Sequence, residues 1–229
     1  MRPVRLVVHS RRAMPVTGFE ITLRRPLAGE RAFGENGRYE ELKGRLRFAI
    51  DPAHPANRAI TDLDLAPRNA QGRVEFAADV SILLPVERSR GNGRILLDVV
   101  NRGNTVTVPN FNHATRPLFG PGADPNPPVD VGDGWLMRQG YVVVSCGWQC
   151  DVPEIPGLFR LHAPEAIGKD GQRLGGRVYT LLQAPEELPH FLLSDRVHIP
   201  YQPADLNDPD AVLLVRDHPD GEPEIIPRR

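Results

Sequence analysis

Ile95-Leu-Leu-Asp-Val-Val-Asn-Arg-Gly-Asn104 is a short apolar run that ends abruptly in polar residues and glycine. Trp135-Leu-Met-Arg-Gln-Gly-Tyr-Val-Val-Val-Ser-Cys-Gly-Trp-Gln-Cys-Asp151 repeats that pattern. The pattern is typical of a buried parallel strand whose carboxyl end opens into a loop. Ligands of open α/β sheets bind at such carboxyl ends, so these two segments also predict where a functional site would lie.

The segment between the two runs favours a parallel crossover. Residues 104–133 are irregular and rich in proline, and loops of this length are often functional. A short helix is expected over 134–139, closed by Gly140, with a buried strand over 141–145. A strand, loop, helix and second strand in this order imply two parallel strands with a right-handed connection.

The rest of the chain predicts many short strands and few helices. Strands are expected at 4–8, 19–23, 39–50, 60–65, 74–84 and 94–100. The tight Arg90-Gly-Asn-Gly93 connection indicates that 74–84 and 94–100 are antiparallel neighbours. Further strands are expected at 175–182 and 191–199, and a hairpin over 211–226 around an Asp-Gly turn. We therefore expect a β-rich region over 1–55, the first half of an α/β sheet over 56–151, and a β-rich insertion or extension over 152–229.

Composition narrows the functional class. The chain has 229 residues, 40% of them hydrophobic and 25% charged, with a net charge of -1. These values predict a globular protein with no partner among nucleic acids or anionic membranes. No run approaches the ~18 apolar residues of a membrane-spanning helix. Cys146 and Cys150 do not form a Cys-x-x-Cys pair, so we expect reduced thiols, a cytoplasmic location, and no metal or cofactor.

Three separate segments of this sequence resemble one protein family. They are Asn101-Arg-Gly-Asn104, Gly140-Tyr-Val-Val-Val-Ser-Cys-Gly-Trp-Gln-Cys-Asp-Val152 and Ile60-Thr-Asp-Leu-Asp-Leu-Ala-Pro-Arg-Asn-Ala-Gln-Gly72. In this order they look like the little-characterised α/β-hydrolase domain-containing proteins. The resemblance implies an α/β-hydrolase-like sheet, of which only the early strands are present. It also implies ester or acyl hydrolysis of a small-molecule ester-like substrate by the complete protein.

Members of that group are longer, and the resemblance places this chain at their N-terminal portion. No Gly-x-Ser-x-Gly nucleophile turn occurs in the sequence. The resemblance therefore implies that no catalytic residue lies in this chain and that the chain alone is inactive. A complementary C-terminal chain, or self-association, is the expected partner.

The same resemblance implies site residues at the two strand ends. Asn101, Arg102, Gly103 and Asn104 stand where the family places its oxyanion loop. Such a loop aims backbone N–H groups at a developing oxyanion, and glycine permits the close approach. Gly103 and Asn104 are the best donors, whereas Arg102 has a structural ion pair as its alternative role.

Further candidates lie beside this loop. Trp148 fits the wall of a substrate pocket, with core packing as the equal alternative. His113, in the irregular loop that follows residues 101–104, is the other substrate-pocket candidate, although none of the seven histidines stands in a recognisable arrangement with Ser or Cys. Asp151 is expected to cap a turn. Two other interpretations of the whole chain remain open, namely a non-catalytic β-rich binding module and an unstable fragment of a frame-shifted gene.

Overall fold

The chain folds around one large β-sheet, here described from a computed structural model. The structure describes residues 4–6, 15–117, 119, 123–181 and 203–227. The strands are β1 (Val4–Leu6), β2 (Val16–Pro26), β3 (Tyr39–Ile50), β4 (Val74–Pro85), β5 (Ile95–Val99), β6 (Val142–Cys146), β7 (Leu161–His162), β8 (Leu213–Val215) and β9 (Glu224–Ile226). The α-helices are α1 (Thr107–Phe111) and α2 (Trp135–Arg138).

The large sheet has the strand order β1-β2-β3-β4-β6-β5, and β7 also pairs with β4. Every pairing is antiparallel except that of β5 with β6. The expected α/β fold, an α/β-hydrolase-like sheet with its early strands, is therefore wrong. The described residues form a mostly antiparallel sheet with two short α-helices and no helical layer on each face. The reason is that local antiparallel pairing of β2, β3 and β4 builds most of the sheet, and it leaves a single parallel pair at one edge.

The position of β6 is a second correction. The short link from β4 to β5 predicts that these two strands are neighbours, but β6 lies between them. Val143 is opposite Leu83 of β4 on one side and opposite Leu96 of β5 on the other. The run Val142–Val144 is continuously apolar, which suits a strand that has a neighbour on each side. The parallel pairing of β5 and β6 is confirmed.

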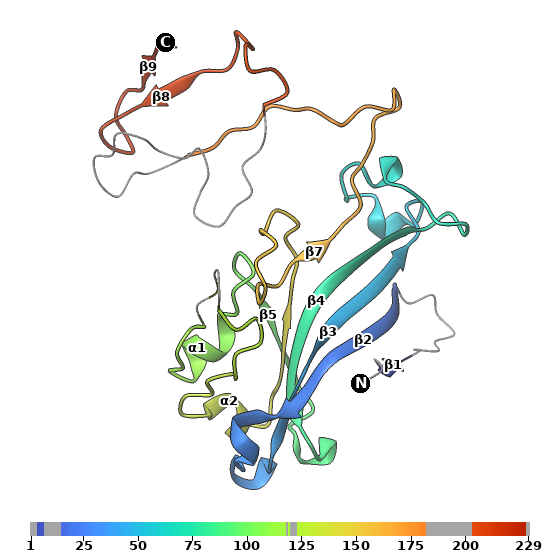
Figure 1. Cartoon of the computed structure of the whole chain (residues 1–229), viewed down its shortest axis with the longest axis vertical. Helices are drawn as coiled ribbons and strands as arrows, with labels where there is room; N and C mark the ends of the chain where they lie inside the picture. The colour runs from blue at the N-terminus through green and yellow to red at the C-terminus, as the bar shows by residue number, and fades with distance from the viewer. Residues whose placement is uncertain (1–3, 7–14, 118, 120–122, 182–202, 228–229) are drawn as a thin grey trace.

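The hydrophobic core lies on one face of the sheet. Tyr39, Leu83 and Val143 point to this face and are almost fully buried. The loops and helices that cover them contribute Leu27, Phe33, Val108, Val131, Leu136 and Met137. Figure 1 shows α1 and α2 together on this side of the sheet. The core is therefore formed between one sheet face and the segment that links β5 to β6.

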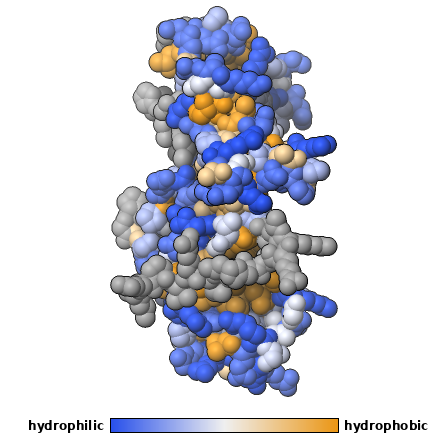
Figure 2. Space-filling model, turned by 90° about the vertical axis from the view of Figure 1, so that its right-hand side faces the viewer, coloured by the Kyte–Doolittle hydropathy of each residue, from blue (hydrophilic) through white to orange (hydrophobic). Residues whose placement is uncertain are grey.

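The opposite face carries apolar side chains that remain partly exposed. Ile95, Leu97 and Val99 of β5 are 69%, 58% and 57% exposed. Their partners on β6 point to the same face and are only half-buried. Figure 2 views the molecule from the right-hand side of Figure 1 and shows hydrophobic residues in orange among hydrophilic ones in blue. The edge strand β5 thus exposes an apolar face, whereas its covered face carries Leu96 and Asp98.

The remaining expectations have mixed outcomes. The hairpin near the C-terminus is confirmed, because Leu214 of β8 pairs with Ile225 of β9 in an antiparallel sheet. The strand expected at 60–65 is wrong, since Asp62 has a positive φ of 57° and a 3-10 helix follows at Leu63–Leu65. Residues 175–181 form no strand, and the strand expected at 191–199 lies outside the described residues.

Candidate functional site at the end of β5

The four-residue loop after β5 is a tight reversal of the chain. The backbone N–H of Asn101 donates to the carbonyl of Asn104, and the N–H of Asn104 donates to the carbonyl of Asn101, both at 2.9 Å. Arg102 and Gly103 between them have positive φ values of 51° and 82°. The N–H groups of Asn101 and Asn104 are therefore occupied within the loop itself.

Arg102 fastens this loop to the segment that follows β6. Its backbone N–H donates to Gln149 Oε1 at 3.0 Å, and its Nη1 donates to Asp151 Oδ2 at 2.8 Å. The ion pair between Arg102 and Asp151 is half-buried. Arg102 thus makes the structural ion pair that was its alternative role, and Asp151 is its partner.

Gly103 differs from its neighbours in the loop. Among the described residues, no acceptor is found for its backbone N–H. Its carbonyl accepts a hydrogen bond from the N–H of Phe159 at 3.0 Å, and the residue is buried. A Cβ at this position would lie 2.9 Å from side-chain carbons of both Val152 and Leu158. Glycine is required here by both the positive φ and the close packing.

Asp98 anchors the start of the loop, and sequence analysis missed it. Its carboxylate is 1% exposed and accepts hydrogen bonds from Ser145 Oγ at 2.9 Å and from the Val106 N–H at 3.2 Å. A charged residue inside an apolar strand was the available signal. Asp98 therefore ties β5 to β6 and to the beginning of α1.

Trp148 and His113, the other two predicted site residues, have different surroundings. Trp148 is 54% exposed, and its Nε1 donates to the carbonyl of Val100 at 2.7 Å. It is not part of a packed core, and its ring lies beside the end of β5. His113 is exposed and follows α1 with a positive φ of 53°. Its ring makes no hydrogen bond or ion pair within the described part of the chain.

A histidine that sequence analysis set aside does have a carboxylate partner. His162 Nε2 of β7 lies 2.9 Å from Asp79 Oδ1 of β4. The two residues are far apart in the sequence, and no motif spacing joins them. The pair lines a cavity of about 530 Å³ on the core side of the sheet. Residues 101–104 do not line this cavity, although Leu158 and Phe159 of its wall contact Gly103.

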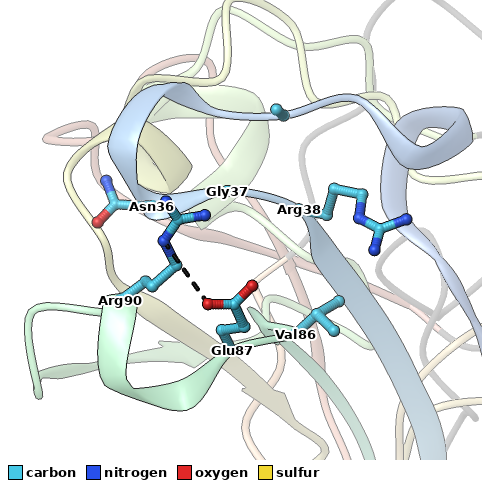
Figure 3. A pocket seen from close by; sticks show the side chains of 7 residues that line it. Asn36, Gly37, Arg38, Val86, Glu87 and Arg90 are labelled. Atoms are coloured by element: carbon cyan, nitrogen blue, oxygen red, sulfur yellow. Dashed lines mark ion pairs between the residues drawn. The ribbon is translucent and has the colours of Figure 1, made fainter.

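A smaller cavity of about 290 Å³ lies near the β2–β3 connection, as Figure 3 shows. Its charged side chains each have an ion-pair partner. Arg90 Nε is 3.8 Å from Glu87 Oε2, and Arg38 Nη1 is 3.1 Å from Glu30 Oε2. These ion pairs are exposed, so the cavity is a surface hollow between two turns.

The described residues offer neither a reactive thiol nor a group of metal ligands at these sites. Burial, and next the charge of Asp79, raise the pKa of the Cys146 thiol, which favours its unreactive protonated form. Cys146 and Cys150 are both free. Across the described ranges, no three His, Cys, Asp or Glu side chains are grouped to hold a metal ion. No α-helix in those ranges is both long and apolar enough to cross a membrane.

Comparison with known proteins leaves the family assignment as a prediction. The chain matches no family model, no curated protein and no solved structure. A function is therefore inferred from the geometry above and from the resemblance of the two strand-end segments.

Proposed function

We propose that this chain contributes an oxyanion-binding donor to an ester-hydrolysing or other acyl-transferring protein related to the α/β-hydrolase domain-containing group. The observation that carries the proposal is the backbone N–H of Gly103, which has no acceptor among the described residues. It lies at the carboxyl end of β5, beside the end of the parallel strand β6. The sequence of both strand ends supports the same assignment.

The chemistry requires few groups from this chain. A tetrahedral acyl intermediate places negative charge on the former carbonyl oxygen, and a fixed N–H in a site without water stabilises that charge. In serine hydrolases of this type, one donor comes from a loop such as 101–104 and the second from the residue after the nucleophile. The N–H groups of Asn101, Arg102 and Asn104 are already hydrogen-bonded, so Gly103 is the donor that we assign.

The proposal has a structural requirement. Gly103 is buried under Val152 and Leu158, so a substrate carbonyl reaches its N–H only after this cover moves. The nucleophile must come from outside this chain, because none of its five serines stands in a Gly-x-Ser-x-Gly turn. We also propose a cytoplasmic location, which is consistent with the free thiols.

The first test uses the chain alone. A fluorophosphonate probe and an activated short-chain ester should give no labelling and no turnover, since Ser145 Oγ donates to Asp98 and has no histidine partner among the described residues. Stoichiometric labelling of any serine in this chain would contradict the proposed division of the active site. The DNA downstream of Arg229 provides the matching genetic check, because an in-frame Gly-x-Ser-x-Gly is expected there.

The second test removes the donor and leaves the packing unchanged. A substitution that adds a side chain at Gly103 does not test the donor by itself, because the new Cβ would collide with Val152 and Leu158. Replacing the amide at Gly103 by an ester in the complete or reconstituted enzyme removes the N–H without adding a side chain, and it weakens only the Arg102 carbonyl as an acceptor for Asn104 Nδ2. Turnover should fall by ~10²–10³ with an unchanged melting temperature. The same replacement at Gly93, an exposed glycine with a φ of 71°, is the control. Equal turnover of the two proteins would refute the assignment.

A non-catalytic binding module is the second candidate. It is favoured by the exposed Ile95, Leu97 and Val99 on the edge strand β5. An unpaired strand edge with an apolar face is suited to docking another chain. This function needs no free N–H at Gly103, so the ester replacement above distinguishes the two proposals.

A further inference from the structure

The cavity beside His162 is lined by charged side chains on one side and by apolar side chains on another. It lies over β3 and β4 and is closed on its other side by residues 154–160. Lys43 and Arg45 of β3, Asp79 of β4 and His162 of β7 all contribute to it. None of these residues belongs to the loop at 101–104, so the inference below goes beyond the proposed function and stands independently of it.

Asp79 uses its acceptor capacity on protein groups. Its Oδ1 accepts from His162 Nε2 at 2.9 Å and from Arg45 Nε at 3.3 Å. Its Oδ2 accepts from the backbone N–H of Arg160 at 3.1 Å. The carboxylate therefore orients both the His162 ring and the Arg45 guanidinium, and it has little capacity left for a ligand.

Several donors of the same cavity have no acceptor. Within the described residues, Arg45 makes no hydrogen bond through Nη1 or Nη2, and Lys43 Nζ has only a 3.5 Å ion pair with Glu41 Oε1. Arg160 Nε and Nη1 are buried without a hydrogen bond. Arg160 Nη1 does lie 2.6 Å from the exposed Glu154 carboxylate, but as an ion pair without hydrogen-bond geometry. Unused donors thus exceed unused acceptors, and this imbalance favours an anion.

The backbone of β2 and β3 is irregular beside this cavity. The β2–β3 ladder is irregular between Ile21 and Leu23, so Thr22 stands out of register at the cavity. A Cβ at Gly44 would collide with the carbonyl of Glu20, so only glycine permits this approach of the two strands. Such irregularities are frequent next to binding and active sites because they redirect side chains.

The wall opposite the cations is apolar. Leu158 and Phe159 are 9% and 7% exposed, and Ile155 and Pro156 complete this side. The Phe159 ring lies 5.9 Å from Lys43 Nζ, so the cationic and apolar parts adjoin one another. A ligand that fits both must carry a negative group at one end and hydrocarbon at the other.

We propose that this cavity binds a small carboxylic acid anion with an apolar chain, its carboxylate held by Arg45 and Lys43. The orienting contact of Asp79 keeps the Arg45 guanidinium over the cavity. His162, held by the same carboxylate, closes the polar end. A carboxylate suits the planar donor pair of a guanidinium, and the apolar wall selects against small inorganic anions.

Calorimetric titration of the full chain with octanoate, octanol and inorganic phosphate tests this inference. Octanoate should bind, whereas octanol and phosphate should each bind at least about tenfold more weakly, as expected for the loss of one charge-assisted contact or of the apolar burial. Absence of octanoate binding at millimolar concentration overturns the proposal. Equal binding of octanol, or equal binding of phosphate, also overturns it.

Three variants locate the site. Arg45→Gln and Lys43→Met should each raise the dissociation constant for octanoate about tenfold, and Lys43→Met keeps the apolar stem beside Phe159. Arg47→Gln is the matched control, because Arg47 is on the same strand but pairs with Glu20 at 2.8 Å and does not line the cavity. Melting temperatures verify that each variant is folded. Wild-type affinity in both folded test variants, or an equal loss in Arg47→Gln, refutes this location.

Discussion

The fold strongly alters the ionisation of Tyr39. Its ring is fully buried, and its hydroxyl donates to the carbonyl of Tyr141 at 3.2 Å. Burial raises the pKa of this phenol to about 12. The unfolded chain, in contrast, ionises Tyr39 near its ordinary pKa of about 10.

The sign of the pH dependence follows from these two values. A raised pKa in the folded state means that the stabilisation is fully present below pH ~10 and is lost as the pH rises toward about 12. In that window each pH unit should lower the free energy of unfolding by about 1.4 kcal/mol. Urea denaturation at pH 8, 10 and 11.5 measures the loss, and Tyr39→Phe should reduce its slope. Tyr179→Phe, at a 78% exposed position, is the control. Equal slopes for the two variants would show that Tyr39 does not cause the loss.

At the scale of elements, a cross-strand ion cluster joins β2, β3 and the turn after β4. Glu40 of β3 is almost buried and lies 2.6 Å from both Arg24 Nε and Arg88 Nη2. Burial alone would raise the pKa of Glu40, but the hydrogen bonds and charges of Arg24 and Arg88 outweigh it and hold the pKa below its usual value. The cluster fixes the register of three consecutive chain segments.

A lowered pKa gives the opposite dependence from that of Tyr39. The contribution of Glu40 is present above its unfolded pKa and is lost as the pH falls through its folded pKa. Glu40→Gln should therefore lower the free energy of unfolding at pH 7 by about 1–3 kcal/mol, and the difference from the wild type should shrink in acid. Glu222→Gln, at an exposed position, controls for the general effect of a lost charge. A constant difference between pH 7 and pH 3 would argue against the ionised cluster.

The elements that sequence analysis identified are those with a local signal. The runs at 95–99 and 142–146 are apolar and end in glycine-containing loops, so both strands and their parallel pairing were predictable. The class of the fold was not predictable from these two strands, because one parallel pair does not reveal that the rest of the sheet is antiparallel. Asp79 and His162 escaped prediction because their contact depends on β7 pairing with β4, and that short strand has no period of its own.

At the scale of the whole molecule, the described residues leave one edge and one face of the sheet open at β5. Leu97 is at the centre of that strand and 58% exposed. An apolar strand edge of this kind promotes association between copies or with a complementary chain. We expect concentration-dependent oligomers of this chain in sedimentation velocity experiments.

The charged variant Leu97→Lys should shift this distribution toward the monomer, because a lysine on an edge strand opposes edge-to-edge pairing. Leu206→Lys is the matched control, since Leu206 is 82% exposed in the segment before β8, outside the large sheet. A monodisperse wild-type monomer at high concentration would contradict the expectation. So would an equal shift in the control variant.

The insertion of β6 between β4 and β5 has a consequence for the nascent chain. β5 is translated directly after β4, but its partner β6 emerges only after residues 100–141 have left the ribosome. During that interval the free edge of β4 and the nearby β5 can form a non-native hairpin across the short 86–94 link. β6 must then displace β5 from β4 before the native sheet can close. The rate of this exchange, rather than the formation of the β2–β3–β4 meander, should limit how fast a newly synthesised molecule matures.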